Sequence, residues 1–407
     1  MNFSIVRLAL RSTLRHRTRS TIALGAIAFG VIAILLAGGF IEWIFWAIRE
    51  AAIQTGLGHV QVVQRGYQEN GIADPFSYLL PETSRDLSLI EGAPEVKVVA
   101  PRLNFGGLIS HGDSTLSFAG EGVDAEKEKL VSRVLNIAQG EGLSAGDPDG
   151  IILGVGLAAN LDVKPGDQVV LVGTSASGSI NAVDAHIRGL FRSDVKAYDD
   201  SALRAPIGLA RRLLKVRGSH IWVIALDKTE DTREWVDRMR AELRSTKLEL
   251  IPWYDLADFY NKSVKLLSSQ MFFVRVIIGL IIVLSISNVL IMSVLERTGE
   301  IGTLMAMGTR ARHILKQFLW EGFLLGLLGT LLGLVIGLIL AHIISFVGIP
   351  MPPPPGRQGG YSAQILLTWG LAASAFALGI VTTSLASLYP AWRASRLEIV
   401  DALRHNR

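Results

Sequence analysis

The chain has 407 residues, of which 50% are hydrophobic and 19% charged, and its mean hydropathy is +0.39. Soluble domains carry about 25% charged residues, so part of this apolar content is expected to face lipid. The absence of cysteine excludes disulfide frameworks, thiolate nucleophiles and cysteine-ligated zinc. The eight histidines stand singly, without metal-ligand spacing. We therefore predict neither a metal site nor catalytic residues on this chain.

The N-terminal segment, residues 1–20, is basic and contains no acid. Phe3, Val6, Leu10 and Leu14 recur at helical spacing beside a stripe of arginines. This pattern predicts either an amphipathic helix in the membrane interface or a basic flank that only sets orientation. The apolar run that follows is longer than the core of a signal peptide, which favours a retained membrane anchor.

Four apolar stretches are each long enough to cross a bilayer, which needs about 20 residues. Their uncharged cores are Thr21–Ile41, Val276–Leu295, Gly322–Val347 and Ile365–Pro390. With their flanks, the predicted spans are residues 21–48, 271–295, 322–347 and 365–390. The sequence thus predicts an α-helical membrane protein with four transmembrane helices and an extracytoplasmic domain between the first and second.

Basic residues mark the cytoplasmic side of membrane proteins. The segments 1–20, 296–321 and 391–407 together carry a net charge of +8, whereas residues 50–270 carry −6. Both termini and the 296–321 loop are therefore expected in the cytoplasm, with residues 49–270 and a Pro-rich loop at 348–364 outside. The sequence pI of about 9.3 reflects this topology, and we predict no nucleic-acid partner.

The outer segment, residues 49–270, reads as a mixed α/β domain on two helical stalks. The first span is expected to continue as helix to about Gly56, and Leu256–Arg275 to lead into the second span. A type II turn is predicted at Lys164–Asp167, and residues 121–148 are expected to form an inserted subdomain. Five runs have strand character: His59–Gln64, Val96–Ala100, Ile151–Leu153, Gln168–Val172 and Ile221–Leu226.

Two further patterns complete the outer segment. Charged and apolar residues recur at helical spacing in Thr232–Arg244, which predicts an amphipathic helix with Trp235 on its apolar side. Gly173–Ser179 has the glycines of a phosphate loop but lacks its lysine, so we interpret it as a polar hairpin loop. No Gly-Lys dipeptide occurs, which places any ATP hydrolysis on another polypeptide.

The cytoplasmic loop begins with a short amphipathic segment, Glu296–Gly308. Such a helix suits docking in a groove on a partner, or it connects two spans and touches only lipid. The residues that would make it are Glu296, Arg297, Glu300, Ile301, Leu304, Met305, Met307 and Gly308.

This segment, with Gln317–Gly322 after it, resembles the loop of the FtsX/macrolide-exporter (MacB-like) superfamily of ABC permeases. The tail Tyr389–Leu397 with Asp401–Arg404 resembles that superfamily's closing motif, and Ile152–Asp167 resembles its periplasmic core domain. The layout is most similar to lipoprotein-releasing (Lol) permeases, since no ATPase domain is fused to the chain.

The resemblance implies a multi-pass protein of the bacterial inner membrane that pairs with a second permease protomer, identical or different. It further implies a cytoplasmic ATPase subunit, with ATP and magnesium bound there and no cofactor on this chain. Glu296–Gly308 would be the coupling helix. A lipoprotein or other amphiphile would be the substrate, with a periplasmic carrier as a further partner.

Two sets of membrane residues have predicted roles. Phe40, Trp43, Phe45 and Trp46 would line a lateral gate for a lipid-anchored substrate. Small residues on the third span would allow close helix packing, within one protomer or between two. These are Gly322, Gly326, Gly329, Gly333 and Gly337.

Two other functions stay open at this point. The ATPase could flex the outer domain to regulate a periplasmic or cell-wall hydrolase without transport. The chain could also be a sensor or scaffold that has no ATPase.

Overall fold

The computed structural model describes residues 17–71, 73–132, 136–193, 195–243, 247–351 and 361–398. Most of the expected N-terminal helix, the Pro352–Pro355 run and residues 399–407 of the tail lie outside these ranges. The chain divides into two units. Unit 1 contains residues 1–46, 263–351 and 362–407, and unit 2 contains residues 47–262 and 352–361.

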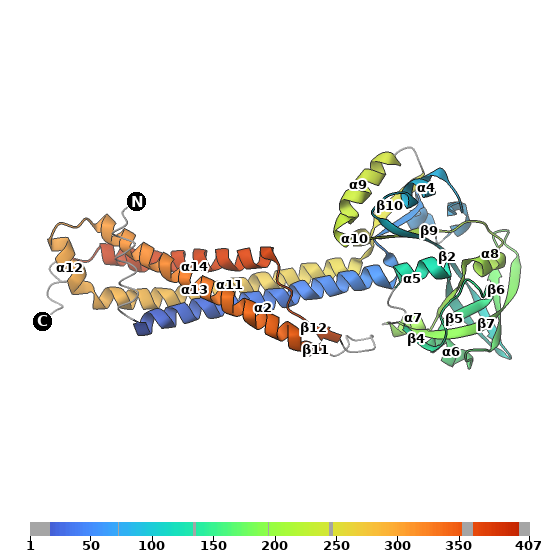
Figure 1. Cartoon of the computed structure of the whole chain (residues 1–407), viewed down its shortest axis with the longest axis horizontal. Helices are drawn as coiled ribbons and strands as arrows, with labels where there is room; N and C mark the ends of the chain where they lie inside the picture. The colour runs from blue at the N-terminus through green and yellow to red at the C-terminus, as the bar shows by residue number, and fades with distance from the viewer. Residues whose placement is uncertain are drawn as a thin grey trace. The chain divides into compact units, whose positions relative to one another are not determined.

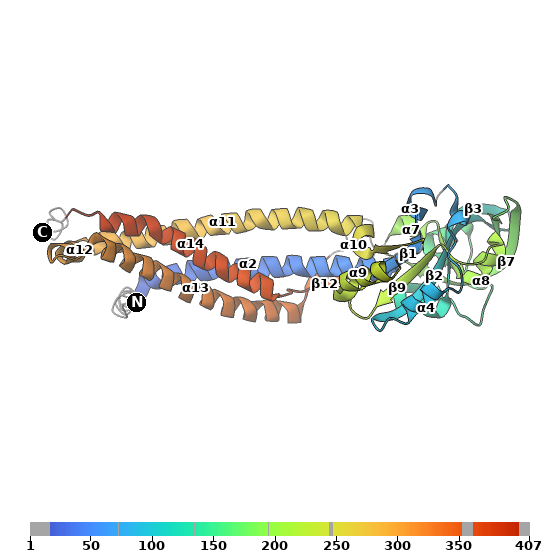
Figure 2. The ribbon, with the colours of Figure 1, turned by 90° about the horizontal axis from the view of Figure 1, so that it is seen from above.

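Unit 1 is a bundle of long helices (Figures 1 and 2). Its elements are α2 (Arg17–Ala52), α11 (Asp258–Glu296), α12 (Thr298–Ala306), α13 (Ala311–Val347), β11 (Ile349–Met351), β12 (Tyr361–Ala363) and α14 (Trp369–Ser395). Within the described ranges, four helices are long and apolar enough to cross a membrane: Ser20–Leu57, Asp258–Glu296, Ala311–Val347 and Trp369–Ser395. Buried residues of α2, α11, α13 and α14 share one apolar cluster that includes Ile27, Ile286, Leu325 and Ala375.

Helix α14 runs past the predicted end at Pro390 to Ser395, and the starts of α13 and α14 also differ from the predicted spans. Helix α13 begins at Ala311, eleven residues before Gly322. It starts there because the turn at Gly308 (φ 94°) and the extended backbone of Arg310 come directly before it. Helix α14 begins at Trp369 instead of Ile365. The Thr368 side chain caps it by accepting the Leu371 N–H, while the Leu366 N–H donates to the Gly39 carbonyl at 2.9 Å.

The stalk helices follow the sequence more closely. Helix α2 runs to Ala52 and ends in a π-helical turn, Ile53–Leu57, in which Gly56 has φ 151°. Helix α11 begins at Asp258, directly after the short helix α10 (Trp253–Leu256). Ile53, Trp253 and Ala257 pack together, so the two stalk ends meet within unit 2.

Unit 2 is built on one ten-stranded sheet. Its strands are β1 (Val60–Gln64), β2 (Val96–His111), β3 (Ser114–Val123), β4 (Asn136–Gly140), β5 (Gly150–Gly154), β6 (Gln168–Thr174), β7 (Ile180–Arg192), β8 (Ala202–Pro206), β9 (Ile221–Leu226) and β10 (Leu248–Pro252). Its remaining helices are α3 (Tyr67–Asn70), α4 (Arg85–Glu91), α5 (Ala125–Val131), α6 (Val155–Leu161), α7 (Lys196–Asp199), α8 (Ile207–Leu214) and α9 (Thr232–Glu242).

The long strand β2 belongs to two parts of this sheet. One part is the antiparallel run β10-β1-β9-β2. Helices α4 and α9 contribute Ile90, Trp235, Val236 and Met239 to the cluster of buried residues on this run. Alternating apolar residues on the strands and the apolar stripe of α9 make this a two-layer α/β arrangement.

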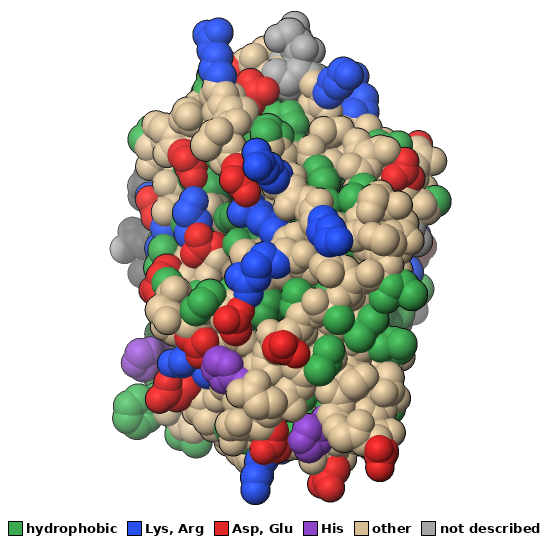
Figure 3. Space-filling view, turned by 90° about the vertical axis from the view of Figure 1, so that its right-hand side faces the viewer, with side chains coloured by type: hydrophobic (Ala, Val, Ile, Leu, Met, Phe, Trp, Pro, Cys, Tyr) green, Lys and Arg blue, Asp and Glu red, His purple; other side chains and the backbone are tan. Residues whose placement is uncertain are grey.

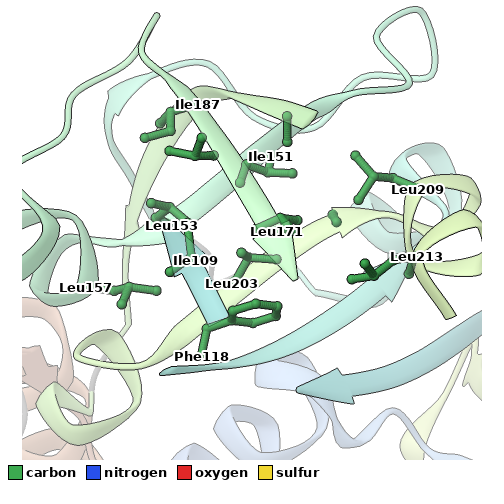
Figure 4. Close-up of a cluster of buried hydrophobic side chains, with 14 of the residues drawn as sticks. Ile109, Phe118, Ile151, Leu153, Leu157, Leu171, Ile187, Leu203, Leu209 and Leu213 are labelled. Atoms are coloured by element: carbon green, nitrogen blue, oxygen red, sulfur yellow. The ribbon is translucent and has the colours of Figure 1, made fainter. Parts of the chain in front are cut away.

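The other part is a closed ring of pairings, β2-β3-β8-β5-β7-β6 and back to β2. Closure depends on Gly107, since a Cβ there would lie against the Val172 carbonyl of β6. Buried side chains from the strands and from α6 and α8 fill this part, as Figure 4 shows for Phe118, Leu153 and Leu213.

Several local predictions are confirmed in unit 2. The run Ile221–Leu226 is strand β9. Of the predicted hairpin loop Gly173–Ser179, residues 175–179 connect the antiparallel strands β6 and β7, whereas Gly173 and Thr174 end β6. The turn at Lys164–Asp167 has Gly166 at φ 101°, and the Asp167 N–H donates to the Lys164 carbonyl at 3.1 Å.

The prediction of an inserted subdomain at residues 121–148 is wrong. Strand β3 continues to Val123 and pairs with β2 and β8, and β4 pairs with β7. Val123, Ala125 and Leu143 share a cluster with Ile152 and Phe191. The short helix α5 interrupts the strand pattern of the sequence there. The strands on either side of it, β3 and β4, both belong to the common sheet.

His220 is a buried titratable group beside the ring. Its Nδ1 accepts the Asn104 N–H at 3.1 Å, and its ring stacks on Tyr67. Burial lowers the pKa of His220 from 6.5 to about 4. The unfolded chain therefore binds this proton at higher pH than the folded chain, and folded stability falls as the pH drops from 6.5 towards 4.

Replacing His220 with asparagine is expected to remove this part of the pH dependence. Asparagine keeps an acceptor for the Asn104 N–H but does not titrate. The wild type is expected to lose about 3 kcal/mol more than the variant between pH 6.5 and 4, at about 1.4 kcal/mol per pKa unit. Denaturant unfolding of the full chain in detergent at several pH values measures this, and equal losses would contradict it.

Candidate functional site

Helix α12 packs its inner face on the ends of three long helices. Thr298, Ile301 and Gly302 are buried. Ile301 lies in a cluster with Val294 of α11 and Phe318 of α13, which also includes Ala391 and Ala394 of α14. The Thr298 hydroxyl donates to the Leu295 carbonyl at 2.8 Å, which binds the start of α12 to the end of α11. A displacement of α12 would therefore press on three membrane-length helices at once.

Arg297 stabilises the packing of α12 on α13. Its side chain is 14% exposed and pairs with buried Glu321 of α13 at 3.3 Å. Its guanidinium also lies 5.6 Å from the centre of the Phe318 ring and 3.5 Å from the Glu300 carboxylate. Arg297 thus joins α12 to α13 and does not point freely outwards.

The other predicted residues lie on α12 or next to it: Glu296 ends α11, and Met307 and Gly308 follow α12. Glu296, Glu300, Met307 and Gly308 are exposed, Met307 to 71%. Leu304 and Met305 are half-buried. The structure therefore divides the predicted residues in two: Arg297, Ile301 and Met305 support the helix, whereas Glu296, Glu300 and Met307 are exposed.

The four aromatic residues predicted at a gate do not share one exposed face. Trp43 is buried, Phe40 and Phe45 are half-buried, and Trp46 is 47% exposed. Of the four, Trp46 presents the largest exposed fraction.

The glycines of α13 face other helices of the same chain. A Cβ at Gly322 or Gly326 would collide with Ser387 or Thr383 of α14. Three others face α2: a Cβ at Gly329 would lie 2.8 Å from Ile27 Cβ, one at Gly333 2.8 Å from Val31 Cβ, and one at Gly337 2.7 Å from Leu35 Cδ1. This row therefore permits close packing of α13 on two neighbours within the protomer.

Sequence reasoning missed an ion network at the end of the first stalk. Arg102 of β2 is 5% exposed and donates through Nε and Nη2 to Glu128 of α5, at 3.1 and 2.6 Å. Its Nη1 donates to the Gly56 carbonyl in the π-helical turn after α2. Arg204 pairs with both Glu128 (3.3 Å) and Glu121 (2.9 Å). We call Arg102, Glu128, Arg204 and Glu121 the stalk anchor.

A second set of contacts holds the same stalk to β9. His59 Nδ1 accepts the Leu226 N–H at 3.1 Å, so the neutral ring carries its proton on Nε2. That atom lies 3.1 Å from the Thr229 hydroxyl, which donates to Glu50 of α2. Burial lowers the pKa of His59, which favours this neutral form. The end of α2 is thus attached to the sheet on two sides.

The surface of unit 2 is mixed in charge. Figure 3 shows Lys, Arg, Asp and Glu side chains interspersed on one face of the molecule.

Four membrane-length helices with an α/β domain between the first and the second define a polytopic membrane protein with a large extramembranous domain. Residues 20–242 match the family model of the MacB-like periplasmic core domain, and residues 272–399 match that of the FtsX-like permease C-terminal region. The first match covers more than half of the chain, so the chain belongs to the family of ABC transporter permeases that carry a MacB-like periplasmic core domain.

Two relatives illustrate this family. The chain is 26% identical to the lipoprotein-releasing system transmembrane protein LolE of Haemophilus influenzae, over 76% of this chain and 78% of that protein. It is 36% identical to the macrolide export ATP-binding/permease protein MacB of Syntrophobacter fumaroxidans, over 30% of this chain but only 15% of that protein. Among solved structures, the periplasmic region of MacB from Actinobacillus actinomycetemcomitans matches 53% of this chain and 95% of that one, with 12% identity and a TM-score of 0.36.

Proposed function

We propose that this permease couples ATP hydrolysis on a separate ATPase subunit to work outside the cytoplasm, and that the work is the release or export of lipoproteins or other amphiphiles. The observation that carries the proposal is α12. Its inner face packs on α11, α13 and α14, while Glu300 on α12 and Met307 directly after it are exposed.

In this proposal the ATPase docks on Glu296–Gly308. Met307 offers a flexible apolar contact and Glu296 and Glu300 offer charges, which suits a groove with basic rims. ATP and magnesium bind to the ATPase, and this chain binds no cofactor. The chain pairs with a second permease protomer, the same or different.

The movement then reaches unit 2 through helices that belong to both units in the chain. Helix α2 begins in unit 1 and ends at residues of unit 2, where the stalk anchor and His59 hold it; α11 connects the units in the same way. Residues 49–270 lie outside the bacterial inner membrane in this proposal, and both termini, α12 and the tail after residue 390 lie in the cytoplasm.

The substrate class rests on the LolE relative, whose name assigns it to a lipoprotein-releasing system. A lipid-anchored substrate would enter from the bilayer, beside exposed Trp46 with Phe40, Trp43 and Phe45 near it in sequence. A periplasmic carrier would accept it. A permease with the same architecture that regulates a cell-wall hydrolase would need neither a path for substrate entry nor a periplasmic carrier.

Affinity purification of the tagged full chain from its native membrane tests the proposal. We expect an ATP-binding-cassette subunit to co-purify and its ATP hydrolysis to rise when lipoprotein is added. A co-purified hydrolase that ATP activates would favour the regulatory function instead. Purification without any ATPase would contradict both.

A further inference from the structure

A groove between α13 and α14 has no part in the proposed function. It has a volume of about 370 Å³ and is lined by Leu319, Trp320 and Phe323 of α13 and Ser384, Leu385, Ser387 and Leu388 of α14. This volume lies within the usual range of small-molecule sites. Both helices are long and apolar enough to span a membrane, and the groove lies near the start of α13 and the end of α14, so we expect it to face lipid at the edge of the bilayer.

The floor of the groove is low and apolar. Gly322 of α13 lies so close to Ser387 that a Cβ on the glycine would collide with Ser387 Cβ. The Ser387 hydroxyl donates to the Ser384 carbonyl at 2.8 Å, so this polar group is satisfied inside the helix. The walls are bulky, and the Trp320 and Phe323 rings pack edge to face at 5.5 Å. The groove therefore fits a flexible alkyl chain.

Each of the two helices has a basic residue beyond the groove, and both basic residues lie towards the same end of the helix pair. On α13, Lys316 is exposed one turn before Trp320, on the same helical face. On α14, Trp392 follows Leu388 by one turn, and the Arg396 guanidinium lies 4.7 Å from the centre of the Trp392 ring. Tyr389 stacks on Trp392. Aromatic rings followed by cations mark the headgroup level of a membrane, which places the groove just inside it.

From this arrangement we propose that the groove is a binding site for one anionic phospholipid. An acyl chain lies between α13 and α14, and the phosphate lies between Lys316 and Arg396. A zwitterionic lipid would fill the groove equally well but would gain less from the two cations. The proposal depends on the bilayer alone and is independent of the ATPase and of any transported substrate.

Native mass spectrometry of the full chain, purified in detergent and titrated with phosphatidylglycerol or phosphatidylcholine of the same acyl chains, tests the site. We expect one phosphatidylglycerol per chain to be retained at least fivefold more strongly than phosphatidylcholine. Lys316→Gln with Arg396→Gln is expected to remove this preference, whereas Arg310→Gln, an exposed cation outside the groove, is expected to keep it.

Ser384→Phe is expected to fill the groove and lower retention of both lipids. Ala377→Phe, at an exposed residue two turns away on the same helix, is the matched control and is expected to retain them. Equal retention in the two phenylalanine variants would overturn the site, as would an unchanged preference in the Gln double variant. Disulfide cross-linking of Ser384→Cys between two chains in membranes would also overturn it, because a second copy would then cover the groove.

Discussion

Replacing Arg102 with methionine is expected to lower the free energy of unfolding by about 3–5 kcal/mol, because it leaves Glu128 buried without its principal cation. The Gly56 carbonyl also loses its donor. Amide hydrogen exchange in residues 53–57 is therefore expected to rise, as the turn after α2 is released from β2. Denaturant unfolding and hydrogen exchange of the full chain measure the two effects.

The double variant Arg102→Met with Glu128→Met separates the effect of an unpaired buried charge on stability from the effect of the lost contact to Gly56. Removing both charges is expected to recover at least half of the lost stability, since apolar pairs often replace buried ion pairs without loss. Exchange in residues 53–57 is expected to stay high, because no donor reaches Gly56. If exchange returned to the wild-type rate, the role of Arg102 at the end of the stalk would be refuted.

Reversing the charge at Glu300 is expected to weaken binding of the ATPase subunit about tenfold, which corresponds to about 1.4 kcal/mol. Glu300 has a side chain 56% exposed and pairs with Arg297 at 3.5 Å. The Glu300 carboxylate is mostly exposed and Arg297 keeps its pair with Glu321, so Glu300→Lys is expected to change the stability of the chain little. Pull-down of the ATPase from detergent extracts measures the binding.

Glu398→Lys is the matched control, since it reverses an exposed acid after α14 and outside α12. It is expected to retain the ATPase. Equal binding by both variants and the wild type would refute the docking surface. Arg297→Met differs from both because it removes a contact to buried Glu321, and its expected effect is on folding.

Local features of the fold could be predicted from the sequence because their causes are local. Strand Ile221–Leu226 is a continuous apolar run, and the turn at Lys164–Asp167 requires only Pro165 and Gly166 in the right order. The membrane-length helices follow from hydrophobic length. The start of α13 at Ala311 was not predicted, because Arg312, His313 and Lys316 interrupt the apolar pattern although they continue the helix.

Features that depend on distant pairing could not be predicted. The ring closes through β2 and β6, which lie more than 50 residues apart, and no local pattern specifies that Gly107 meets Val172. The stalk anchor is similar. Arg102 lies between Pro101 and Leu103 in β2, which is a signal in the sequence, but its partners Gly56 and Glu128 are 46 and 26 residues away.

The proposed function requires α12 and residues 49–270 to lie on opposite sides of the bilayer. Because the chain contains no cysteine, single exposed alanines can report this: Ala306 in α12 and Ala176 in the β6–β7 hairpin. With a membrane-impermeant maleimide on intact spheroplasts, we expect Ala176→Cys to be labelled at once and Ala306→Cys only after permeabilisation. Labelling of Ala306→Cys in intact spheroplasts, or protection of Ala176→Cys, would contradict the account.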